Sequence, residues 1–160
     1  MFVSLTDRVH KFYSRSWRER RLFLEATLLS GLMRLLILTV PFRTIVSLFR
    51  LAERQPATSA MGFCLNKFCL NNISEISWAV QVASAYTPWK SNCLCQALTA
   101  MIMLSRIHIP CTLYLGVAKD TGIDESITAH AWLCSGESFI TGDSVHKQYV
   151  VISSFSLPSD

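Results

Sequence analysis

The most apolar part of the chain, residues 17–51, is interrupted by charged residues and a proline. Glu25, Arg34, Pro41 and Arg43 divide it into uncharged runs. Each run is shorter than the about 20 residues that a membrane-spanning helix needs. The pattern therefore argues against a transmembrane segment.

Pro41 divides the same region into two predicted helices. A proline cannot continue a helix from within, but it fits the first turn of one. The first helix should therefore end near residue 39, and the second should run through Arg50. Together they would form an apolar helical hairpin. Two interpretations stay open: the hairpin covers the protein core, or it offers a docking surface to a partner or a bilayer.

Two further helices are predicted in the middle of the chain. Apolar residues recur at helical spacing over residues 74–86, and residues 93–106 are almost wholly apolar, which is typical of a helix buried in a core. Both follow residues that cap helices, namely Asn71, Asn72 and Ser74 for the first and Ser91 or Asn92 for the second.

The last third of the chain changes to the alternating pattern of β-strands. Strands are expected at residues 112–117, 127–133, 138–141 and 148–155, with turns at Gly136 and Gly142. Helices followed by strands predict an α+β fold in which an antiparallel meander packs on the buried helix. Residues 52–62, with a proline and a glycine, would connect the hairpin (1–54) to this core (55–160).

The composition adds a strong charge asymmetry to this picture. The 160 residues fit one domain, only 16% of them are charged, and the net charge is +4. Residues 1–54 hold ten Lys or Arg against four Asp or Glu, whereas the remainder is slightly acidic. No zinc-finger spacing, phosphate loop or basic strand interleaved with aromatic residues is present, so nucleic acid is not the expected partner. The basic end favours an acidic partner or a membrane surface.

The cysteines argue for a reducing compartment. They are Cys64, Cys69, Cys93, Cys95, Cys111 and Cys134. Because no segment resembles a secretion signal, free thiols in the cytoplasm are expected rather than disulfides. The spacing fits no structural zinc site, and no metal or other cofactor is expected.

Cys93 is the candidate nucleophile, because it stands where a predicted helix begins. Unpaired N–H groups and the positive end of the helix dipole stabilise a thiolate there. His130 is the candidate base. It alternates with Thr128 and Trp132 along its strand and could meet the helix start across the sheet. A thiolate–imidazolium pair would supply the nucleophile near neutral pH and later protonate the leaving amine.

Asp143, at the end of the next strand, is the candidate third member of a triad. An antiparallel neighbour can bring its carboxylate to the imidazole and fix the orientation of the ring. The backbone N–H of Cys93 and the Trp89 indole are candidate oxyanion donors. Structural alternatives stay open, since such a cysteine or histidine is often a core residue and Gly-Asp-Ser is ordinary turn chemistry. His108 and His146 are alternative bases.

Three segments together resemble a known family. They are Asn92-Cys93-Leu94-Cys95-Gln96-Ala97-Leu98, Ile109-Pro110 with Leu113-Tyr114-Leu115-Gly116-Val117, and Ala129-His130-Ala131-Trp132-Leu133. In this combination most of the chain resembles the lasso peptide leader peptidases, which are transglutaminase-like. The resemblance implies a papain/transglutaminase-like core with Cys93, His130 and Asp143 as the triad. Cys95 is then a helix residue, because two positions turn a side chain about 200° around a helix.

The resemblance also implies a function and partners. Such an enzyme removes the leader from a ribosomally made precursor peptide before an ATP-dependent macrolactam synthetase closes the ring. In the split form of the family a separate small protein binds the leader, so this chain is expected to act with one. The N-terminal hairpin would contact that protein, the synthetase or the membrane. Two rival functions stay open: a transglutaminase-like acyl transferase with the same triad, and a non-catalytic scaffold near the membrane.

Overall fold

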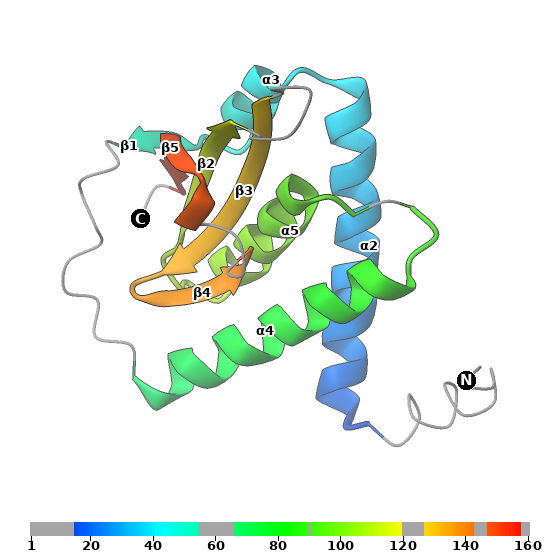
Figure 1. The fold of residues 1–160 in the computed structure, drawn as a ribbon. Coiled ribbons are helices and arrows are strands. Elements are labelled where there is room, and N and C mark those ends of the chain that lie inside the picture. The colour runs from blue at the N-terminus through cyan, green and yellow to red at the C-terminus, as the bar shows by residue number, and fades with distance from the viewer. Residues whose placement is uncertain (1–14, 55–65, 90, 120–126, 143–146, 158–160) are drawn as a thin grey trace.

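Helices packed on one face of an antiparallel sheet make up the structure, a computed structural model that describes residues 15–54, 66–89, 91–119, 127–142 and 147–157 (Figure 1). The helices are α2 (Trp17–Thr39), α3 (Phe42–Leu48), α4 (Lys67–Tyr86) and α5 (Cys93–Ser105). The strands are β1 (Ala52–Arg54), β2 (Thr112–Lys119), β3 (Ile127–Ser135), β4 (Ser138–Thr141) and β5 (Val150–Ser156). This arrangement confirms the α+β fold class.

The ends of α2 follow from its sequence. Ser16 and Glu19 form a capping box, in which the Ser16 hydroxyl accepts from the Glu19 N–H at 3.2 Å and the Glu19 carboxylate accepts from the Ser16 N–H at 2.9 Å. The helix ends at Thr39, two residues before Pro41, as predicted. After Pro41, α3 runs for seven residues and stops at Leu48, short of the expected end at residue 50.

Helix α4 begins at Lys67 rather than at residue 74, so the predicted start was wrong. Its cap is Asn66, whose side-chain oxygen accepts from the Cys69 N–H at 2.9 Å. Asn72, expected to be a cap, lies inside the helix instead. Its amide donates to the Phe68 carbonyl at 2.8 Å and accepts from Arg18 of α2 at 2.7 Å. These two bonds satisfy an asparagine that would otherwise favour a helix end.

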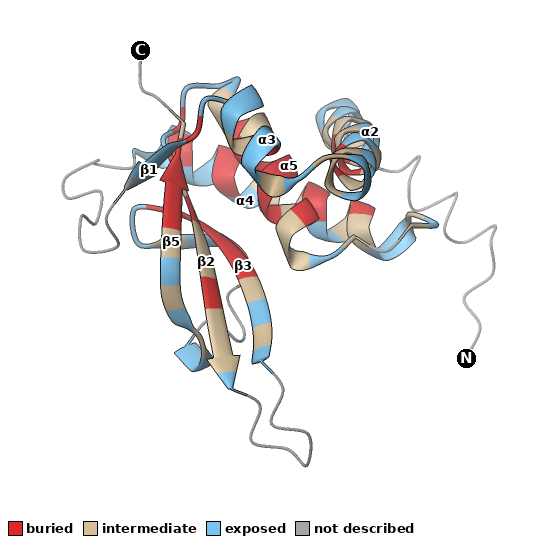
Figure 2. Ribbon diagram, turned by 90° about the horizontal axis from the view of Figure 1, so that it is seen from above, coloured by how far each residue is buried: buried red, intermediate tan, exposed pale blue. Residues whose placement is uncertain are grey.

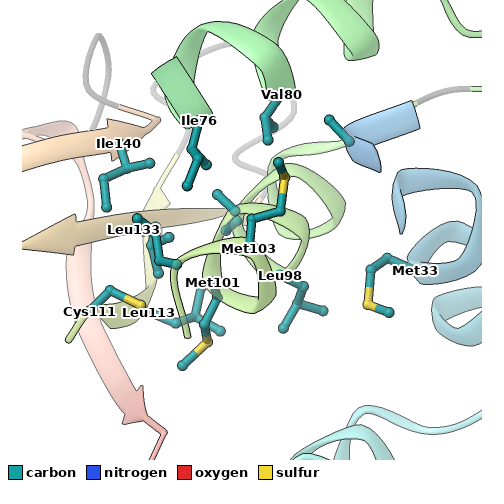
Figure 3. Close-up of a cluster of buried hydrophobic side chains, with 14 of the residues drawn as sticks. Met33, Ile76, Val80, Leu98, Met101, Met103, Cys111, Leu113, Leu133 and Ile140 are labelled. Atoms are coloured by element: carbon teal, nitrogen blue, oxygen red, sulfur yellow. The ribbon is translucent and has the colours of Figure 1, made fainter. Parts of the chain in front are cut away.

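Helix α5 confirms the predicted buried helix and its cap. The Asn92 side chain accepts from the Cys95 N–H at 3.0 Å, and the helix runs from Cys93 to Ser105. Seen from above, α5 lies between the sheet and α2 (Figure 2). The core is built around it. Figure 3 shows Leu98, Met101 and Met103 of α5 among Met33, Ile76, Val80, Leu113, Leu133 and Ile140 from its neighbours.

The sheet is more than the meander that the sequence predicts. Strands β2, β3 and β4 do follow one another, but β5 returns to the other side of β2, and the order is β1-β5-β2-β3-β4. Residues 52–54, expected in a connection, form strand β1, with Glu53 opposite Phe155 of β5. A strand of three residues is too short to show an alternating pattern.

By length and composition, α2 is sufficient to cross a membrane, and only 17% of its most apolar window is buried in the protein. This finding differs from the sequence prediction, which counted uncharged runs alone. Core helices of soluble proteins and signal sequences also have this length and composition.

Candidate active site

Cys93 is the first residue of α5 and is half-buried. The Asn92 cap uses its side chain for the Cys95 N–H and its carbonyl for the Gln96 N–H at 3.0 Å. The N–H groups of the first helical turn have no acceptor within the helix. Together with the helix dipole they can stabilise a thiolate at this position.

Cys95 has the opposite environment. It is fully buried, and its thiol donates to the Ser30 carbonyl of α2 at 3.2 Å. Burial raises the pKa of the Cys95 thiol above its ordinary value. The Cys95 thiol is therefore held in its protonated form, facing α2 rather than solvent.

The turn that leads into α5 is also fastened to α2. The Trp89 indole N–H donates to the Ser30 hydroxyl at 3.3 Å. The Trp89 ring packs over Gly31, where an added Cβ would come within 3.2 Å of it. Because its N–H is already used, Trp89 does not provide the second oxyanion donor that the sequence led us to expect.

His130 lies in an aromatic group on the sheet. Its ring centroid is 5.1 Å from that of Tyr149 and 6.0 Å from that of Trp132, which in turn stacks on Tyr114 at 5.7 Å. The His130 Nε2 atom is 3.3 Å from the Gly142 carbonyl oxygen. Since a carbonyl only accepts, this contact requires a proton on Nε2.

Gly142 brings the chain close to this ring. It has a φ of +77°, and a Cβ there would meet the Trp132 Cβ at 2.7 Å and His130 Nε2 at 2.9 Å. Only glycine combines this backbone conformation with such close approach. Asp143 is bonded directly to Gly142, but it lies outside the described residues, as does His146. Its predicted contact with the imidazole stays a prediction.

The structure does not join Cys93 to His130. Ala131 and Leu133 of β3 belong to the core beside α5, so His130 and Trp132, which alternate with them, face the other side of the strand. No hydrogen bond links Cys93 with His130, both of which are described. The catalytic triad therefore stays a prediction.

The alternative base His108 lies beyond the last turn of α5, exposed and at a φ of +55°. Helix α5 has thirteen residues from Cys93 to Ser105, a length of about 20 Å along the axis at 1.5 Å per residue. His108 therefore cannot serve Cys93 in this fold.

An open groove of about 470 Å³ runs between α4 and β4. Apolar and small polar side chains line it: Leu70, Ile73, Ser74, Ser77, Trp78, Gln81, Ser138 and Phe139. None of the predicted triad residues is among them. Within the described ranges, no three His, Cys, Asp or Glu side chains gather as a metal site would require.

A half-buried cysteine at the start of a buried helix that packs against an antiparallel sheet is placed where the helix end can stabilise a thiolate. The comparison with protein families agrees. Residues 36–154 match the transglutaminase-like superfamily, and the chain belongs to this superfamily. Such a domain implies cysteine protease or acyl-transferase chemistry. No match was found among curated proteins or among solved structures.

Proposed function

We propose that this protein is a cysteine peptidase that removes the leader from a ribosomally made, lasso-type precursor peptide. The contrast between its two neighbouring thiols carries the proposal: Cys93 opens α5 and is partly accessible, whereas Cys95 is buried against Ser30. Membership of the transglutaminase-like superfamily supports the reaction class. The precursor as substrate rests on the resemblance of the motifs around Cys93 and His130.

In the proposed reaction the Cys93 thiolate attacks the carbonyl carbon of the last leader residue. The C–N bond breaks, and the leaving amine of the core peptide takes a proton from the His130 imidazolium. Water then hydrolyses the thioester, which releases the leader as a carboxylic acid and restores the thiol. Asp143 would orient the imidazole, and the Cys93 backbone N–H would stabilise the oxyanion.

This mechanism requires the His130 ring to come within hydrogen-bond reach of Cys93, a contact absent from the described structure. Because His130 faces away from α5 in the described structure, the contact needs a change in the β3 backbone, and not only the tightening of a long hydrogen bond when substrate binds. We expect such a rearrangement at the His130 end of β3.

A separate leader-binding protein is the expected partner, and the macrolactam synthetase would consume the freed amine. The expected place of action is the cytoplasm. Acyl transfer to an amine by the same residues is the alternative reaction, since the superfamily includes that chemistry.

The first test needs no substrate. Iodoacetamide labelling of the full chain at neutral pH, followed by mass analysis, should show Cys93 reacting faster than the other cysteines. His130→Asn should slow this labelling, whereas His108→Asn, a histidine far from Cys93, should leave the rate unchanged. Slow labelling of Cys93 would instead favour the non-catalytic scaffold.

The second test uses a synthetic lasso-type precursor peptide with and without the leader-binding protein. Cys93→Ala should abolish cleavage, and Cys95→Ala should retain it with the fold intact. Mass analysis separates the two reactions: hydrolysis gives a leader with a free carboxylate, and transfer gives a leader joined to an added amine. A dead Cys95→Ala beside an active Cys93→Ala would show that the nucleophile is misplaced.

A further inference from the structure

Helix α2 carries a line of exposed apolar side chains along its outer face. We call it the leucine stripe; it consists of Trp17, Leu24, Leu28, Leu32, Leu35 and Leu38. The spacing of three, four or seven residues places them on one side of the helix. Leu28 is 74% exposed and Trp17 is 75% exposed. An apolar surface of several hundred Å² is usually an interaction site.

The opposite face of α2 is committed to the protein. Ala26, Ser30 and Met33 are buried there, and Ser30 holds both Cys95 and Trp89. Figure 2 shows the buried part of α2 turned toward α5. To cross a membrane, α2 would have to leave all of these contacts. Any partner of the leucine stripe therefore binds from outside, with α2 still on the core.

Two ion pairs hold α2 in this orientation. Arg18 pairs with Glu75 of α4 at 2.8 Å, and Glu25 pairs with Arg106, just after α5, at 2.6 Å. Exposed pairs of this kind add little stability. They agree with the orientation that the buried face sets, and one of them occupies Glu25, an acidic group beside the stripe.

Basic side chains flank the leucine stripe at both ends. Arg21 is exposed near its start, and Arg43 and Arg50 are exposed on and just after α3, which lies at the other end of α2 (Figure 1). The nearby Glu19 is neutralised by Arg15 at 2.8 Å. A second copy of the chain would bring these positive ends together or leave them unpaired. An anionic surface would neutralise both ends while it covers the leucines.

We propose that the leucine stripe lies flat on a membrane surface that contains anionic lipid. Over 23 residues α2 is about 35 Å long, which lets the leucines enter the boundary of the acyl chains while Arg21, Arg43 and Arg50 meet headgroups. Trp17, with Arg20 5.6 Å from its ring, would sit at headgroup level. The proposal does not depend on the peptidase reaction.

The test is flotation of the full chain with vesicles of phosphatidylcholine alone and of phosphatidylcholine with phosphatidylglycerol. We expect binding to the anionic vesicles, weakened by salt. Leu28→Gln with Leu35→Gln should lower the partition coefficient about tenfold or more, because two exposed leucines no longer enter the bilayer. Arg21→Gln should lower it about fivefold.

The matched control is Phe68→Gln with Leu70→Gln on α4, where the side chains are also exposed, at 63% and 44%, but lie outside the stripe. This control should bind like the original chain, and circular dichroism should show that every variant folds. Failure of the original chain to bind anionic vesicles would overturn the proposal, as would equal binding to neutral ones. A dimer in solution that the stripe variant dissociates would show a second copy to be the occupant.

Discussion

Gly142→Ala should destabilise the fold far more than its size implies. At a φ of +77° the new methyl group would lie 2.7 Å from the Trp132 Cβ, 2.9 Å from His130 Nε2 and 3.0 Å from the Ala131 carbonyl oxygen. The left-handed backbone costs a non-glycine residue about 1–2 kcal/mol. Forcing neighbours apart in a packed region costs about 1–3 kcal/mol more.

We therefore expect the free energy of unfolding to fall by about 2–5 kcal/mol. At a domain size of about 150 residues, this corresponds to a fall in Tm of roughly 4–20 °C. Urea unfolding followed by circular dichroism and a thermal scan would both measure it.

Gly136→Ala is the matched control, because Gly136 also has a positive φ, of 56°, but is exposed in the turn between β3 and β4. Its cost should be the backbone strain alone, partly offset by the stiffer unfolded chain, and so about 1 kcal/mol or less. Equal effects of the two substitutions would show that the packing around Gly142 contributes nothing. The inferred approach of Gly142 to His130 would then be refuted.

Three further predictions concern the active site, the packing of α2 on the core and the stability at alkaline pH. Asp143→Asn should slow precursor cleavage less than His130→Ala, because loss of the base removes proton transfer whereas loss of the carboxylate removes only orientation; equal rates for Asp143→Asn and the original chain would leave a dyad. Met33→Ala, at a position 1% exposed, should cost about 2–5 kcal/mol in urea unfolding, against under about 0.5 kcal/mol for the exposed Leu28→Ala. Burial raises the pKa of Cys111 to about 12, so between pH 8 and 10 only the unfolded chain loses this proton. Stability should therefore fall by about 1–2 kcal/mol over this range, and Cys111→Ala should flatten that part of the pH profile.

Local signals predicted the helix that carries Cys93. The start of α5 was predictable because Asn92 lies next to it and caps it through its own side chain. The start of α4 was not, because Asn72 is satisfied inside the helix by Arg18, which is 54 residues away. The pairing of β5 with β2 was not predictable either, because pairing between strands that are distant in the sequence does not affect the local spacing of apolar residues.

The different exposure of the Cys93 and Cys95 thiols was predictable from helix geometry, and the surroundings of Trp89 were not. Cys95 is two positions after Cys93, which places it about 200° further around the helix. If Cys93 faces outward, Cys95 therefore faces the core. The partner of the Trp89 indole, Ser30, stands 59 residues earlier on α2. No spacing rule links the two residues.

The orientation of His130 shows where strand alternation stops being informative. Alternation correctly groups His130 with Trp132 on one side of β3 and Ala131 with Leu133 on the other. Both sets contain apolar residues, so the pattern cannot tell which side meets α5. The structure gives that side to Ala131 and Leu133, and the proposed catalytic contact then depends on a movement of the histidine.

Helix α2 links the two proposals physically. Its inner face fastens the turn before Cys93 through Ser30, and its outer face carries the leucine stripe. Packed helices lie about 8–10 Å apart, so a membrane bound to the stripe would lie little more than one helix layer from α5. A chain anchored in this way would cut its precursor next to the bilayer. A rigid α2 would hold Cys93 at a fixed distance from the membrane surface. Substitutions in the stripe should therefore move cleavage activity from the membrane surface into solution, without changing the rate on a soluble precursor.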